Sequence, residues 1–368
     1  MIGKIKTNYT YYKWVVLITG LLGVFGALGL ARYGYSMLLP SMQADLNLDN
    51  SHAGLLATAN LSGYLAFALI GGAMSAYFGT RLIAAAGLLL AGIGMICTGL
   101  TNTFVSAAIW RGMTGLGSGA ANMAIMGLWA AWFSKRNRGF ASGIAVSGSS
   151  VGLIFTGLFV PWIISNYGEG AWHFAWFIFG GITVVLAISA YLIIRNSPSD
   201  MEPSCGHEHG HEHVHKCKNK CESKSENTNR SESRNSQPIM QPSGSSCQWK
   251  QVYLSARVWC FGLVYSAFGF SYIIYMTFFV KSLESDYGYT VAESGNLFMM
   301  MGWLSLLCGL IWGVVSDRIG RKNSLIILFL IHTVAFALFG IGNSHAYFLI
   351  SAILFGLSAL LSAEPYRK

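Results

Sequence analysis

Residues 313–322 read Gly-Val-Val-Ser-Asp-Arg-Ile-Gly-Arg-Lys, a short charged segment between two long apolar stretches. The stretch before it covers residues 292–315, and the one after it covers residues 324–342. Each is close to the roughly 20 apolar residues that an α-helix needs to cross the hydrocarbon core of a bilayer. Gly320 permits a tight turn between them. The segment therefore predicts two membrane helices joined by a short basic loop.

Apolar stretches of similar length recur through the rest of the chain. Hydrophobic residues make up 53% of the 368 residues and charged residues only 11%, whereas a soluble domain carries about 25% charged residues. We therefore predict an all-α polytopic membrane protein. The ten predicted spans are residues 14–39, 53–78, 82–101, 104–132, 139–164, 172–194, 257–280, 292–315, 324–342 and 346–361.

Lysine and arginine lie mostly on one side of these spans. If the N-terminus is cytoplasmic, the outer loops hold Lys281 as their lone basic residue, and the positive-inside rule favours this orientation. The net charge of +9 is then mostly a topology signal for an inner (plasma) membrane protein. A basic face with interleaved aromatic residues, which nucleic-acid binding requires, is not visible, so we expect no nucleic-acid partner. The inner flanks hold Lys4, Lys6, Lys13, Arg81, Lys135, Arg136, Arg138, Arg195, Arg257, Arg318, Arg321 and Lys322.

One long polar segment divides the chain. Residues 196–250 are rich in Ser, Asn, Lys, Glu and His, and we expect this cytoplasmic loop to be largely disordered. It separates an N-terminal half with six spans, residues 1–195, from a C-terminal half with four spans, residues 251–368. The predicted organisation is therefore six helices, a long inner loop and four helices.

Four segments resemble signatures of the major facilitator superfamily of transporters. The 313–322 segment resembles that family's loop signature G-x-x-x-D-R-x-G-R-K at its second position, and residues 72–81 resemble the first copy with Ala76 in place of the aspartate. Arg111-Gly-Met-Thr-Gly-Leu-Gly-Ser-Gly119 resembles the signature of the family's fourth span. Residues 29–40 are similar to the first span of the YbfB/YjiJ-type branch of the family.

The resemblance implies a major facilitator fold in which two six-helix halves alternate access to a site near the bilayer midplane. Because four spans follow the loop, the C-terminal half is incomplete, and we expect a chain truncated after the tenth span. The family's loop signature latches one half against the other, and the second copy is expected to latch against the inner end of the fifth span. The implied gating residues are Gly313, Asp317, Arg318, Gly320, Arg321 and Lys322.

Two arginines within predicted spans are the best candidates for binding a transported solute. Charges inside spans are costly and usually face a cavity, and the guanidinium forks of Arg32 and Arg111 suit a carboxylate or phosphate. The alternative for Arg111 is that it orders the fourth span without touching the solute. Polar side chains near them complete the predicted site, which comprises Arg32, Tyr35, Asn60, Tyr64, Arg111 and Asn122.

Two other polar residues within spans have simpler interpretations. Asn122 is expected to form a hydrogen bond between helices more readily than to bind solute. His332, in the ninth predicted span, has a protonatable ring that suits a relay, but such a residue is more often a neutral, hydrogen-bonded packing group.

The central loop carries the most specific local chemistry. Five histidines alternate with other residues, and cysteines flank them, which suits Zn, Ni, Co or Cu. Three interpretations stay open: a metal buffer or sensor, a variable linker that binds metal incidentally, and a feed for a transported metal. The predicted ligands are His207, His209, His211, His213, His215, Cys217 and Cys221.

We thus predict a secondary transporter for a small, anionic solute, which acts as a monomer in the lipid bilayer and needs no cofactor. The alternatives are a non-transporting remnant that binds metal through its loop and a metal-related efflux carrier. A nucleophile–base set, a phosphate loop and a cofactor motif are all missing from the sequence, so we do not expect an enzyme.

Overall fold

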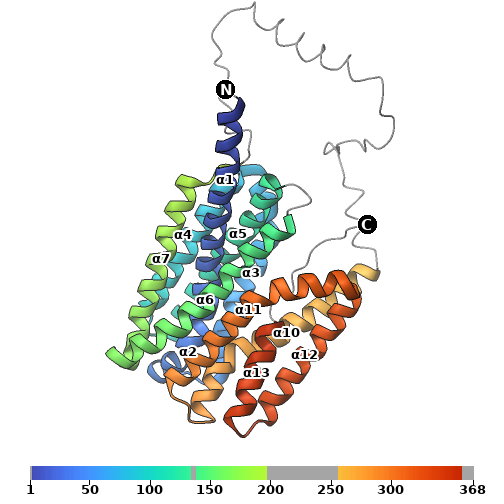
Figure 1. The fold of residues 1–368 in the computed structure, drawn as a ribbon. Coiled ribbons are helices and arrows are strands. Elements are labelled where there is room, and N and C mark those ends of the chain that lie inside the picture. The colour runs from blue at the N-terminus through green and yellow to red at the C-terminus, as the bar shows by residue number, and fades with distance from the viewer. Residues whose placement is uncertain (1, 134–137, 197–255, 359–368) are drawn as a thin grey trace, which may run out of the picture. The chain divides into compact units, whose positions relative to one another are not determined.

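The computed structural model describes residues 2–133, 138–196 and 256–358, and within them all regular elements are helices (Figure 1). The first span is one continuous rod made of an α-helix, a π-helical segment and a second α-helix. The helices are α1 (Ile2–Val24), η1 (Phe25–Tyr33), α2 (Gly34–Asp45), α3 (Asn50–Phe78), α4 (Thr80–Gly99), α5 (Phe104–Trp132), α6 (Arg138–Tyr167), η2 (Glu169–Ala171), α7 (Trp172–Ile193), α10 (Ala256–Ser285), α11 (Val291–Ile319), α12 (Arg321–Ile341) and α13 (His345–Ser358).

Each of the ten predicted spans coincides with one of these rods, and the all-α membrane fold is confirmed. Seven helices in the described part of the chain are long and apolar enough to cross a membrane, or eight if α3, which bends by 46°, counts as one span. The other two are α5 and α13. In α5 the buried polar residues Arg111, Thr114 and Ser118 lower the hydropathy, and α13 has 14 residues.

Most of the described helices belong to one compact unit, residues 1–200 and 268–368. The second unit is residues 201–267, of which the structure describes the start of α10. In the large unit, α5 packs against α3 and α4, and α4 packs against α7, while α13 packs against α11 and α12. The first six spans contact the last four through α6 and α11, which lie side by side in Figure 1.

The α6–α11 contact depends on glycines that bring two backbones together. A Cβ on Gly157 would lie 2.8 Å from the carbonyl oxygen of Gly295. Further along the same contact, the buried hydroxyl of Ser150 donates to Ser305 Oγ at 3.0 Å. Small side chains are the usual means of close helix packing in membranes, so this contact is a tight connection between the two halves.

The π-helical segment η1 lies in the middle of the first span and ends at Tyr33. Such wide turns are rare and are frequently found at functional sites. Close packing accompanies the turn, since a Cβ on Gly29 would lie 2.8 Å from Gly152 Cα in α6. The wide turn therefore presents Arg32 and Tyr33 from a backbone that packs directly on α6.

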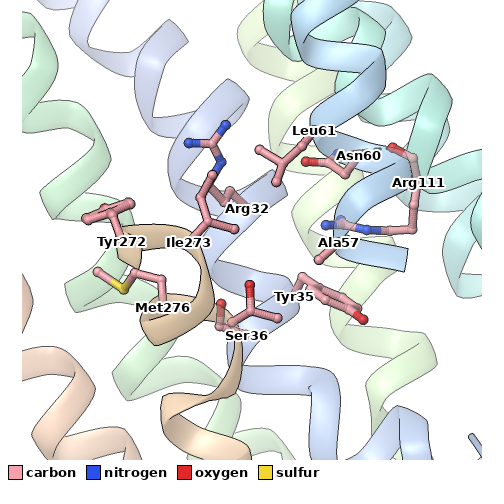
Figure 2. Close-up of a pocket in the computed structure, with 11 residues that line it drawn as sticks. Arg32, Tyr35, Ser36, Ala57, Asn60, Leu61, Arg111, Tyr272, Ile273 and Met276 are labelled. Carbon is pink, nitrogen blue, oxygen red and sulfur yellow. Dashed lines mark hydrogen bonds between the residues drawn. The ribbon is translucent and has the colours of Figure 1, made fainter. Parts of the chain in front are cut away.

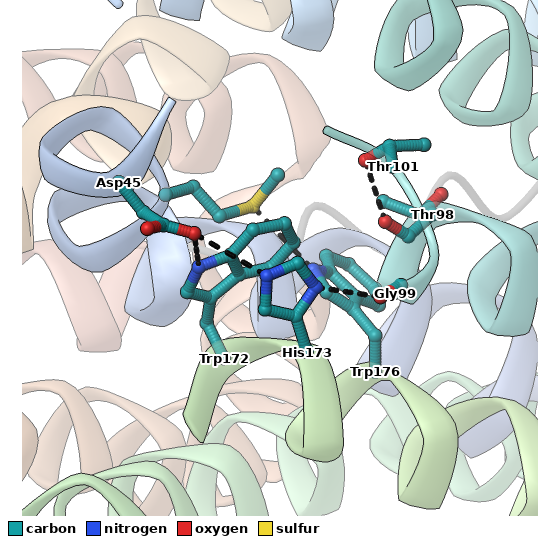
Figure 3. A network of polar contacts seen from close by, with 8 residues as sticks. Asp45, Thr98, Gly99, Thr101, Trp172, His173 and Trp176 are labelled. Carbon is teal, nitrogen blue, oxygen red and sulfur yellow. Dashed lines mark hydrogen bonds and ion pairs between the residues drawn. The ribbon is translucent and has the colours of Figure 1, made fainter. Parts of the chain in front are cut away.

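A polar network ties three helix ends of the N-terminal half together (Figure 3). Asp45, at the end of α2, accepts a hydrogen bond from Trp172 Nε1 at 3.0 Å and lies 3.3 Å from His173 Nε2. His173 Nδ1 lies 2.6 Å from the carbonyl oxygen of Gly99, at the end of α4. The network fixes the first turn of α7, which also carries Trp176.

Short loops join the helices through specific caps. Asp49 accepts a hydrogen bond from the backbone N–H of His52 at 2.7 Å, and this bond holds the pKa of the Asp49 carboxyl below its usual value. Gly79 and Gly320 have φ values of +89° and +84°. Glycine adopts this conformation at little cost, so the tight turn predicted at Gly320 is confirmed.

Candidate functional site

A small pocket lies between the N-terminal helices and α10 (Figure 2). Four of the six solute-binding residues predicted from sequence line it, namely Arg32, Tyr35, Asn60 and Arg111. The remaining lining residues are apolar or carry a hydroxyl. Three come from the N-terminal half, namely Ser36, Ala57 and Leu61, and four come from α10, namely Tyr272, Ile273, Met276 and Thr277.

Arg111 is locked in place by its surroundings. Its side chain is 1% exposed, and Nη1 donates to the carbonyl oxygen of Ala31 at 2.8 Å. The guanidinium carbon lies 4.4 Å from the centre of the Tyr35 ring and 5.2 Å from that of Trp176. Tyr35 is itself held by a hydrogen bond from its hydroxyl to the carbonyl oxygen of Ala53 at 2.8 Å. Aromatic faces and a backbone carbonyl thus stabilise this charge, to which the described residues offer no carboxylate.

Arg32 is held much less firmly. It is half-buried, and its guanidinium carbon lies 5.2 Å from the centre of the Tyr64 ring. Its Nε, like that of Arg111, is buried and has no hydrogen-bond partner within the described residues. The same part of the chain offers no ion pair to Arg32 or to Arg111. The pocket therefore contains two guanidinium groups, and Arg32 keeps unused donors.

The predicted amides hold helices together around the arginines. Asn60 Nδ2 donates to the carbonyl oxygen of Arg111 at 3.0 Å, which joins α3 to α5 beside the pocket. Asn122 Nδ2 donates to the hydroxyl of Tyr64 at 2.7 Å. Tyr64 and Asn122 lie outside the pocket lining. Tyr64 contacts the guanidinium of Arg32 and Asn122 holds Tyr64, so both residues support Arg32.

Sequence reasoning missed the contribution of α10. Tyr272 lines the pocket, and its hydroxyl lies 2.7 Å from the hydroxyl of Tyr33. This hydrogen bond joins the first span to the seventh. Tyr33 follows the predicted Arg32 directly, and its position beside a π-helical turn was not visible in the sequence. A tyrosine within an apolar span was the available signal for Tyr272.

His332 lies away from the pocket, in the core of the C-terminal half. It is 3% exposed, and its Nδ1 lies 2.9 Å from Ser358 Oγ. The Ser358 hydroxyl donates to the carbonyl oxygen of Phe355 at 3.0 Å, so its oxygen accepts from the His332 Nδ1–H. This geometry fits the hydrogen-bonded packing role.

The predicted gating segment is described in part. Arg318 and Lys322 are exposed at the junction of α11 and α12, which Gly320 forms. The side-chain surroundings of Gly313, Asp317 and Arg321 lie outside the described residues, and their predicted latch stays a prediction.

The degraded first copy is held within its own half. Asn196 Oδ1 accepts from the backbone N–H of Arg81 at 2.8 Å and from Thr80 Oγ1 at 3.3 Å. The Arg81 Nε donates to the carbonyl oxygen of Tyr191 at 2.6 Å, and its guanidinium lies over the Tyr191 ring. Residues at and just beyond the end of α7 thus hold the start of α4, which directly follows the helix that carries Ala76.

The predicted metal ligands, His207 to Cys221, lie outside the described residues. Within residues 2–133, 138–196 and 256–358, no group of three or more His, Cys, Asp or Glu side chains is placed to hold a metal ion.

Comparison with known proteins establishes the family. The model of the Major Facilitator Superfamily matches residues 21–363. The chain belongs to this superfamily. Members of the superfamily are transporters, not enzymes, so the absence of catalytic activity predicted from sequence is confirmed.

The relatives of this chain include several transporters that are named for acidic solutes. The "Probable sulfoacetate transporter SauU" of Cupriavidus necator is 23% identical over 79% of this chain and 62% of its own length. The 4-hydroxybenzoate transporter PcaK of Acinetobacter baylyi is 24% identical over 50% of this chain and 40% of its own length. The hexuronate transporter of Bacillus subtilis is 25% identical over 50% of this chain and 43% of its own length. The chain thus spans less than two thirds of the length of these curated relatives.

Solved structures agree on the fold. The nucleoside transporter NupG superposes with a TM-score of 0.64 at 14% identity, over 94% of this chain and 79% of its own. A bacterial homologue of the human lysosomal transporter Spinster, in an inward-facing conformation, gives a TM-score of 0.61 at 15% identity, over 94% and 73% of the two chains. The major facilitator fold predicted from the sequence is therefore confirmed.

Proposed function

We propose that this superfamily member is a secondary transporter that moves a small organic anion by alternating access, with the anion bound at the pocket between the N-terminal helices and α10. The observation that carries the proposal is the pair of guanidinium groups, Arg32 and Arg111, for which the described residues supply no carboxylate. An uncompensated charge in a span is costly. A bound anion would supply the missing counter-charge.

Arg32 is the group that would grip the anion. Its fork has unused donors, including the buried Nε, and it lines the pocket. A guanidinium binds a carboxylate or sulfonate through two parallel hydrogen bonds. Arg111, already committed to Ala31 and to two aromatic rings, would add positive potential and hold the pocket wall. Relatives named for sulfoacetate, 4-hydroxybenzoate and hexuronate transport favour the same class of solute.

Uptake by the full chain in proteoliposomes tests the proposal. The probes are radiolabelled sulfoacetate, 4-hydroxybenzoate and glucuronate, with uncharged glucose as the negative comparison. We expect saturable uptake of at least one anion, and loss of at least tenfold in its apparent affinity for R32Q. K281Q removes a cation outside the pocket lining and should match the wild type. Absence of uptake of all three anions, or an R32Q variant equal to the wild type, would contradict the proposal.

We infer an inner-membrane location with a cytoplasmic N-terminus from the distribution of Lys and Arg in the loops. Reporter fusions after residues 101 and 138 should report the outer and inner side, respectively. The opposite pattern would contradict a cytoplasmic N-terminus.

The metal-binding role of His207 to Cys221 stays a separate prediction. Purified full chain dialysed against Zn²⁺ should retain metal, and a variant lacking residues 205–221 should not, as measured by elemental analysis. Equal metal content in both proteins would eliminate the segment as a metal site.

A further inference from the structure

The hydroxyl pair of Tyr33 and Tyr272 connects the two halves of the molecule at the pocket. The two oxygens are 2.7 Å apart, with Tyr33 in η1 and Tyr272 in α10. Tyr272 lines the pocket and lies on the opposite side of it from Arg111 (Figure 2).

The pair has one proton more than it uses. Each phenol carries one O–H, which donates once, and an oxygen that accepts. One of the two protons lies between the oxygens. No other hydrogen bond to either hydroxyl is found within the described part of the chain. One O–H therefore remains available to a ligand.

Packing shows which of the two tyrosines can offer that proton to the pocket. Tyr33 is 5% exposed, and its ring meets the ring of Phe298 edge-on at 6.4 Å. Tyr272 stacks on Phe355 at 5.4 Å and on Phe268 at 6.1 Å, which fixes the direction of its hydroxyl. Tyr272 forms part of the pocket wall and Tyr33 does not. The Tyr33 hydroxyl is thus suited to donate to Tyr272, and the Tyr272 hydroxyl to donate into the pocket.

We propose that Tyr272 is a solute-binding residue, which accepts a hydrogen bond from Tyr33 and donates its own proton to the anion that Arg32 holds. The proposal rests on the function proposed above and adds a ligand from the C-terminal half. Arg32 and Tyr272 then contact the same anion from different halves, so binding itself joins the halves across the pocket.

The proposal narrows the class of solute. An anion that takes the fork of Arg32 and the Tyr272 hydroxyl needs at least two acceptor oxygens on one head group, as a carboxylate or sulfonate has. The pocket wall around them includes the apolar side chains of Leu61, Ile273 and Met276. We therefore expect an organic acid with a compact, partly apolar body, and weaker binding of a spherical halide.

Binding of the three anion probes to purified full-length protein tests the role of Tyr272. Y272F keeps both ring stacks and removes the donor, so we expect a loss in affinity of about ten- to a hundredfold, as for a hydrogen bond to a charged group. Y33F leaves the Tyr272 proton in place and should lose less than about threefold. Y275F is the matched control, because the Tyr275 hydroxyl bonds to Ser351 outside the pocket lining. Thermal unfolding of each variant checks that the fold is intact.

The outcomes separate this inference from the proposed function. If the wild type binds an anion and R32Q loses it, but folded Y272F binds like the wild type, Tyr272 is not a ligand and the inference fails alone. A large loss in Y33F with little loss in Y272F would assign the spare proton to Tyr33 and also overturn it. If the wild type binds none of the probes, or R32Q binds them unchanged, the anion site itself is wrong and both proposals fail.

Discussion

Replacing Arg111 by lysine separates a stabilising role of this arginine from a solute-binding role. R111K keeps the buried charge, so the cost of desolvation stays nearly the same. It removes the planar fork that donates to the carbonyl oxygen of Ala31 at 2.8 Å while stacking between Tyr35 and Trp176. Loss of a hydrogen bond from a charged donor costs about 1.5–3 kcal/mol. Weaker contact with the two rings adds about 0.5–2 kcal/mol. We therefore expect R111K to destabilise the fold by roughly 2–5 kcal/mol.

The assay is SDS-induced unfolding in mixed micelles, followed by tryptophan fluorescence and paired with anion binding on the same samples. R32K is the matched variant, since Arg32 makes a single ring contact and its Nε has no partner within the described residues. It should lose less than about 1 kcal/mol of stability but about tenfold in anion affinity, because lysine lacks the fork. If R111K unfolds at the wild-type midpoint but loses tenfold in anion affinity, Arg111 does not stabilise the fold and instead binds the solute.

Two further substitutions test the fold around the site. G152A puts a Cβ 2.9 Å from the carbonyl carbon of Gly29, so we expect a loss of about 1–3 kcal/mol from overpacking and a smaller monodisperse fraction in size-exclusion chromatography. G181A, with no atom within 4 Å of the added carbon, should behave like the wild type. N196A removes the acceptor for the Arg81 backbone N–H and should lower stability by about 1 kcal/mol in the same unfolding assay; an unchanged midpoint would show that water replaces the amide.

Hydropathy and charge predicted most of the fold because a bilayer imposes a simple length rule on every helix. The prediction for α5, residues 104–132, agrees with the observed helix Phe104–Trp132 even though Arg111 lies within it. The prediction was least accurate for the first span, which was predicted as residues 14–39 and is observed as a helical rod from Ile2 to Asp45. Its helix continues through Pro40 and into polar sequence at both ends, where hydropathy no longer marks a helix but backbone hydrogen bonds continue it.

The site was predictable as a set of residues and not as a set of contacts. The spacing of a regular helix places Tyr35 one turn from Arg32 on the same helix face. The observed ring instead stacks on Arg111. The wide turn of η1 ends just before Tyr35, and helical spacing says nothing about a partner on α5. The contact of Tyr272 was even less predictable, because its hydroxyl bonds to Tyr33, a residue of the other half.

The different surroundings of the two arginines favour the proposal that this pocket binds an anion and not a cation. Arg111 has two aromatic faces and a carbonyl oxygen, which offset much of the cost of burying its charge. Arg32 has one ring, and the Nε atoms of both arginines are buried without a hydrogen-bond partner within the described residues. A buried donor without an acceptor costs about 1–3 kcal/mol, and more when it is charged. A bound carboxylate or sulfonate relieves this cost at Arg32, and a bound cation would increase it. Because Arg32 has fewer contacts than Arg111, it is the side chain at which the charge of a bound anion would lower the energy most.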